Sequence, residues 1–82
     1  MGVGMLWFDN STSILSIKIQ KAFEYYHKKY GRKPDLVLVH PSMLDEKELK
    51  GFTMKSDVAE VTVRPYRTVL PGHIWIGIED KN

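Results

Sequence analysis

The chain has 82 residues, of which 43% are hydrophobic and 27% are charged, and it contains no cysteine. Its length allows one core and its composition is too apolar for a disordered protein, so we expect residues 1–82 to form a single small domain. The lack of cysteine excludes disulfides and thiolate metal sites, and the formal net charge of +2 is too small to indicate a nucleic-acid partner by itself.

Apolar runs along the chain are short. The longest, Met5–Phe8 and Leu36–Val39, fall far below the roughly 20 residues that span a bilayer. The first residues also carry no basic region of the kind that opens a signal peptide. We therefore expect a cytoplasmic protein with no membrane-spanning helix.

The first predicted element is a strand over Met5–Phe8, and the clearest one is a helix over Ser13–Tyr30. Within the helix, apolar side chains return with the 3.6-residue period of one helix face. The polar residues 9–13 are candidates to cap the first turn, and Gly31 followed by Pro34 is typical of a helix end. The apolar stripe consists of Leu15, Ile19, Ala22, Phe23, Tyr26 and Tyr30.

Three further strands are predicted over Leu36–His40, Val58–Arg64 and His73–Ile78, and only Val58–Arg64 alternates cleanly between apolar and polar residues. Between the first two of these strands, Ser42 and Asp45 have the spacing of a capped short helix.

The order of these elements predicts the architecture. A strand, a long helix and a second strand match a parallel crossover unit, and the last two strands are expected to form an antiparallel hairpin with a long loop. The predicted fold is α+β, or a small α/β fold, with the order β-α-β-(short α)-β-β. It has a mixed four-stranded sheet with one long helix packed on it.

A sheet of four strands exposes more surface than this helix can cover. Four strands about 4.8 Å apart are nearly 20 Å wide, whereas one helix covers about 10 Å. Since three of the strands are apolar on both faces, some apolar surface should remain unless the long and the short helix lie on opposite sides and the long loop closes the gaps. Apolar surface of this kind is usually an interface. We predict a homo-oligomer or a component of a larger protein assembly, with Trp7, Trp75 and Ile76 in the contact. The alternative is that both tryptophans fill the core of the monomer.

Clustered basic residues suggest nucleic acid as a second possible partner. Residues 18–33 carry six basic side chains against Glu24 alone, and the loop after the third strand places an aromatic ring between two arginines. If these segments adjoin, they form one basic patch; otherwise the lysines are simply the solvated face of the helix. The candidate polyanion-binding residues are Lys18, Lys21, Lys28, Lys29, Arg32, Lys33, Arg64, Tyr66 and Arg67.

No motif for catalysis, for a cofactor or for a metal is present, so we expect a non-enzymatic protein. The three histidines are not spaced like zinc ligands. His40 and Ser42 follow the second strand and His73 opens the last one, so these three residues define a candidate ligand pocket, because ligands gather at the carboxyl ends of parallel strands. Alternatively, His40 is bonded to the backbone at a strand end.

Part of the chain resembles a known family. In residues 30–42 an aliphatic strand is flanked by prolines, residues 61–65 form a strand ending in proline, and residues 70–77 carry a Pro-Gly turn before an aliphatic strand that ends at glycine. In these features residues 30–78 are similar to a segment of tailed-phage major capsid proteins of the HK97-like fold. The resemblance implies a phage or mobile-element origin and packing against copies of itself. It does not imply shell formation, because the chain lacks the family's extended arm, spine helix and extended loop.

Overall fold

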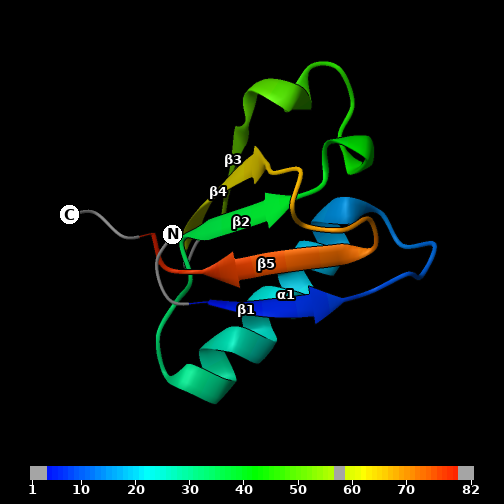
Figure 1. Cartoon of the computed structure of the whole chain (residues 1–82). Coiled ribbons are helices and arrows are strands. Elements are labelled where there is room, and N and C mark those ends of the chain that lie inside the picture. Colours follow the sequence, from blue (N-terminus) through cyan, green and yellow to red (C-terminus); the bar gives the residue numbers. More distant parts are fainter. Residues whose placement is uncertain (1–3, 57–58, 80–82) are drawn as a thin grey trace.

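Helix α1, Leu15–Tyr30, packs on one face of a five-stranded mixed sheet in the computed structural model, which describes residues 4–56 and 59–79 (Figure 1). In the view of Figure 1 the helix crosses behind the strands. Two short 3-10 turns, η1 (Pro41–Met43) and η2 (Glu48–Lys50), follow the second strand. The strands are β1 (Gly4–Phe8), β2 (Leu36–Val39), β3 (Phe52–Lys55), β4 (Glu60–Pro65) and β5 (His73–Gly77).

The α+β class is confirmed, but the prediction of four strands is wrong. The fifth strand, β3, forms an edge by pairing antiparallel with β4, and its side chains alternate between half-buried and exposed. Only four residues carry that alternation, too few to separate a strand from a loop in the sequence alone. The predicted third strand corresponds to β4, and its expected start at Val58 lies outside the described residues.

The strand order is β1-β5-β2-β4-β3, with β2 and β4 parallel and the other three pairs antiparallel. The predicted hairpin between the last two strands is wrong, because β2 lies between β4 and β5. The crossover through α1 does join parallel strands, β1 and β2, but β5 is inserted between them. Since β2 is central and hydrogen-bonded on both sides, all four of its side chains are buried.

Helix α1 begins two residues later than predicted, and the expected side-chain cap is absent. Its N-cap is Ile14, which makes no capping hydrogen bond with its side chain. The polar segment before it instead forms a turn in which Ser11 donates its N–H to the Asp9 carboxylate at 2.9 Å. Hydrogen bonds from the side chain of Ser11 and, to a smaller extent, from its backbone lower the pKa of the Asp9 carboxyl below its usual value. The predicted end at Gly31 is confirmed, with a left-handed φ of 70°.

The core lies between α1 and one face of the sheet, called here the helix face. The stripe of α1 contributes Ile19, Ala22 and Tyr26, each at most 2% exposed. Alternation along the strands sends every second side chain toward the helix. The sheet residues buried in this core are Val37, Val39, Val61, Val63, Ile74 and Ile76. The opposite side, called here the open face, carries no helix (Figure 1).

The predicted short capped helix is present as two 3-10 turns, and the caps differ from those expected. The Ser42 N–H donates to Nδ1 of His40, so His40 rather than Ser42 caps η1. A reciprocal pair forms three residues later: the Asp45 N–H donates to the Glu48 carboxylate and the Glu48 N–H donates to the Asp45 carboxylate, both at 2.9 Å. This is the geometry of a capping box, shifted from the predicted position.

Removing this capping pair gives a first prediction. We expect Asp45→Ala to lower the free energy of unfolding by about 1 kcal/mol, because the Glu48 N–H loses the carboxylate acceptor and keeps only the Asp45 backbone carbonyl at 3.1 Å. Urea denaturation followed by circular dichroism measures the change. Glu46→Ala is the control, since Glu46 is an exposed carboxylate next to the pair. Equal destabilisation by both variants would contradict a specific capping role.

Candidate interaction surfaces

A patch of apolar side chains lies on the open face, over β1 and β5. Leu6 and Phe8 are 60% and 59% exposed, and Trp75, opposite Leu6 on β5, is partly buried. Leu70, which is 64% exposed, lies in the β4–β5 loop just before β5. The other half of this face is closed by the chain itself, because Val69 in the β4–β5 loop packs on Leu36, Leu38 and Trp75. We call Leu6, Phe8 and Trp75 the open-face patch.

The pairing of β1 with β5 brings these side chains together. Leu6 lies directly opposite Trp75, and Phe8 lies opposite His73 with the two ring centroids 4.9 Å apart. The indole of Trp75 extends over Gly4, where a Cβ atom would lie 2.6 Å from Trp75 Cε2. A hydrogen bond of 2.9 Å from the Asp9 N–H to the Gly72 carbonyl holds the β4–β5 loop against the end of β1. The patch therefore rests on a defined backbone.

The predicted contact residues separate onto the two faces of the sheet. Trp75 belongs to the open-face patch, whereas Trp7 lies on the helix face with its ring 5.1 Å from that of Tyr25. Ile76 is 0% exposed in the core and presents no surface to a partner. Sequence reasoning missed Leu6 and Phe8. The signal for both was the run Met5–Phe8, which is apolar at every position although alternate side chains face opposite sides.

The indole N–H of Trp7 is an unsatisfied hydrogen-bond donor within the described residues. The Trp7 Nε1 atom is buried and has no hydrogen-bond partner in residues 4–56 and 59–79. A buried N–H usually finds an acceptor, so this donor is an unsatisfied group on the helix face near Tyr25. It is not directed at the open-face patch, since Trp7 and Leu6 alternate along β1.

The basic residues do not form one patch. Val61 and Val63 of β4 face α1, so alternation places Arg64 on the open face, away from the helix lysines. Arg64 there pairs with Glu79 at 3.2 Å, and both side chains are solvent-accessible. Tyr66 and Arg67 are exposed in the loop that follows. The basic residues of α1 and those of the β4–β5 loop are therefore separate surfaces.

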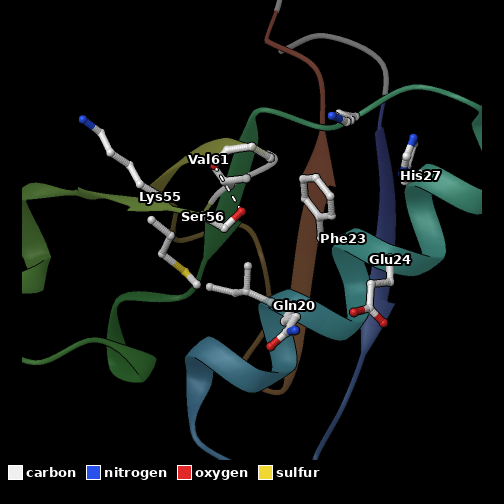
Figure 2. A pocket seen from close by; sticks show the side chains of 11 residues that line it. Gln20, Phe23, Glu24, His27, Lys55, Ser56 and Val61 are labelled. Carbon is white, nitrogen blue, oxygen red and sulfur yellow. Dashed lines mark hydrogen bonds between the residues drawn. The ribbon is translucent and has the colours of Figure 1, made fainter.

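A groove of about 680 Å³ lies beside α1 on the helix face, where the helix leaves β3 and β4 uncovered. Figure 2 shows Phe23 extending from α1 into this space, with Lys55 and Ser56 on the opposite side. Gln20, Glu24 and His27 form the helix wall. The groove combines an apolar floor with charges of both signs at its rim, and it holds none of the three residues predicted to form a ligand pocket.

The residues of that predicted pocket make local contacts. Nδ1 of His40 accepts the Ser42 N–H at 3.0 Å and lies 2.8 Å from the Ser42 hydroxyl. Nδ1 of His73 lies 3.2 Å from the carbonyl oxygen of Pro71, and its ring packs on Phe8. In both cases the imidazole is held by a turn of its own segment. This arrangement orders the two strand ends.

Within residues 4–56 and 59–79, no group of three or more acidic or histidine side chains is arranged to hold a metal ion. None of the helices in that part of the chain combines the length and the apolar character needed to cross a membrane. No protein-family model, curated protein or solved structure matches this chain.

Proposed function

We propose that the protein is a non-enzymatic interaction module that self-associates through the open-face patch. The observation that carries this proposal is the exposure of Leu6 and Phe8, at 60% and 59%, on the same face of β1, where Leu6 lies opposite the partly buried Trp75 and no α-helix of the described residues packs. Apolar side chains that are exposed singly are ordinary, but a contiguous group around a tryptophan is characteristic of a contact surface.

A second copy of the chain is the occupant that this surface fits best. A two-fold axis through the patch brings the same aromatic and aliphatic side chains of both copies together, as an isologous interface requires. The molecule measures 32 × 30 × 25 Å, so one broad face has room for the about 800 Å² that each partner buries in an interface of standard size. The patch itself contains no charged side chain, so two copies can meet without burying like charges.

The resemblance of residues 30–78 to phage capsid proteins supports the same proposal, because subunits of that family pack against copies of themselves. A phage or mobile-element origin follows from this resemblance alone and remains part of the proposal. The local hydrogen bonds of His40 and His73 support a non-enzymatic role, because the histidine rings serve the turns rather than a substrate site.

Substitution of Leu6 tests the proposal. We expect the unmodified chain to show about twice its mass of 9.5 kDa in light scattering after size-exclusion chromatography. Leu6→Glu should weaken the association at least about tenfold, because the interface would then bury an unpaired carboxylate. The variant should keep its fold, since the side chain is 60% exposed and loses little native packing.

Leu49→Glu is the matched control, because Leu49 is 44% exposed in η2, outside the patch. It should leave the association unchanged. A mass of 9.5 kDa for the unmodified chain from low micromolar to millimolar concentration would overturn the proposal. Equal dissociation by Leu6→Glu and Leu49→Glu would overturn the assignment to the open-face patch.

A further inference from the structure

The lysines of α1 are concentrated on one flank of the helix. At 100° per residue, Lys18, Lys21, Lys28 and Lys29 fall within about 100° of its circumference, on the side that faces away from the groove. Two contacts locate this flank beside β1: the Lys18 Nζ donates to the Asp9 carbonyl at 3.0 Å, and Tyr25 packs on Trp7. We call these four lysines together with Tyr25 the basic flank.

The fold offsets only part of the charge of the basic flank, because the Asp9 carboxylate attracts Lys18 and Lys21. Lys21, Lys28 and Lys29 are exposed, and the one ion pair that joins two described residues is that of Arg64 with Glu79, on the other face of the sheet. Glu24, the single acid of α1, lines the groove and also lies one helical turn before Lys28. The four lysines still outnumber these two acids, and the remaining positive field along this flank is available to an external anion.

The row of lysines on the basic flank is long enough to contact an extended polyanion. Lys18 and Lys29 are separated by eleven positions, or about 16 Å along the helix axis at a rise of 1.5 Å per residue. Four positive charges along this length can follow several successive phosphates of one strand, since a phosphate backbone presents regularly spaced negative charges. A single small anion would engage only one end of the row.

Aromatic rings lie among these charges. Tyr25 and Tyr30 are 47% and 44% exposed, and the Lys29 ammonium lies 5.8 Å and 5.4 Å from their ring centroids. Aromatic rings beside a basic row are the combination with which proteins bind single strands, because unpaired bases stack on the rings while phosphates meet the cations. In a duplex the base faces are covered by neighbouring base pairs, so the rings would contribute nothing.

From these observations we infer that the basic flank of α1 binds single-stranded nucleic acid without sequence preference. The site is separate from the open-face patch, since α1 lies on the opposite face of the sheet. Binding therefore does not depend on self-association, and Leu6→Glu should leave the affinity per chain unchanged. Arg64 lies on the open face of the sheet and Arg67 in the β4–β5 loop, so neither belongs to the basic flank.

Fluorescence anisotropy with a labelled 16-nucleotide single strand of mixed sequence tests the inference. If four lysines each displace one counterion, the logarithmic salt slope is about −2.8, and the affinity should fall about 50-fold between 50 and 200 mM salt. Lys21→Gln combined with Lys28→Gln should halve the slope and weaken binding about tenfold at 50 mM salt. Tyr25→Leu should reduce the preference for the single strand over a duplex of the same sequence.

Lys47→Gln combined with Lys50→Gln removes the same charge from the exposed η2 region and is the matched control. It should leave affinity and slope close to those of the unmodified chain. The inference is overturned if no binding occurs at 50 mM salt, or if both double variants weaken binding equally. It is also overturned if vesicles containing phosphatidylserine bind the chain while the oligonucleotide does not, because the flank would then recognise an anionic membrane surface.

Discussion

Ile76→Ala is expected to lower the free energy of unfolding by about 3 kcal/mol, because it leaves a cavity at a position that is 0% exposed. Ile76 lies in the core between α1 and the sheet, with Ile74 on the same strand. For a domain of this size each kcal/mol corresponds to about 4–8 °C in Tm, so the melting temperature should fall by about 12–24 °C. Thermal unfolding by circular dichroism measures the effect.

The control for Ile76→Ala is Ile17→Ala, because Ile17 is 42% exposed on α1 and alanine favours helix. Its expected change is within about 0.5 kcal/mol. Both substitutions are best compared in chains that also carry Leu6→Glu, so that self-association does not add to the stability. If Ile76→Ala left the stability unchanged and instead weakened association, Ile76 would be a contact residue and its placement in the core would be wrong.

Gly4→Ala is expected to lower the free energy of unfolding by about 1–3 kcal/mol through overpacking. A Cβ atom at this position would lie 2.6 Å from Trp75 Cε2 and 2.7 Å from the carbonyl oxygen of Ile76. The indole can move away, but the backbone carbonyl belongs to the β1–β5 ladder and cannot move without disturbing the pairing. The substitution should therefore displace Trp75 toward solvent and alter the open-face patch.

Fluorescence reports this displacement in a chain that also carries Trp7→Phe, since the protein has two tryptophans. The emission of Trp75 should move to longer wavelength in Gly4→Ala. Gly31→Ala is the control: it costs about 1 kcal/mol because Gly31 has a φ of 70°, but nothing lies within 4 Å of its added Cβ atom. Unchanged emission and stability in Gly4→Ala would show that the indole does not lie over Gly4.

Local patterns in the sequence predicted most of the elements. The 3.6-residue stripe identified α1, and Gly31 identified its end, because a helix carries its own hydrogen bonds and its own period. Three strands were recognised from apolar runs and β4 from its alternation, whereas β3 was not recognised, since four alternating residues become a strand only through their pairing with β4. The same dependence on pairing explains the wrong hairpin: no residue of β5 indicates that its neighbours are β1 and β2.

For the surfaces, the predicted elements indicated that the helices could not cover the sheet. That prediction rests on the width of the strands, the lengths of the helices and the apolar residues on both strand faces. Which side chains remain exposed was decided by the tertiary structure. Trp7 and Trp75 are similar in the sequence, yet strand alternation and the side on which α1 packs place one against the helix and the other on the open face. Arg64 is likewise separated from the lysines of α1 by the sheet itself. A residue's own segment determines its period, but the face to which that period points depends on partners distant in the chain.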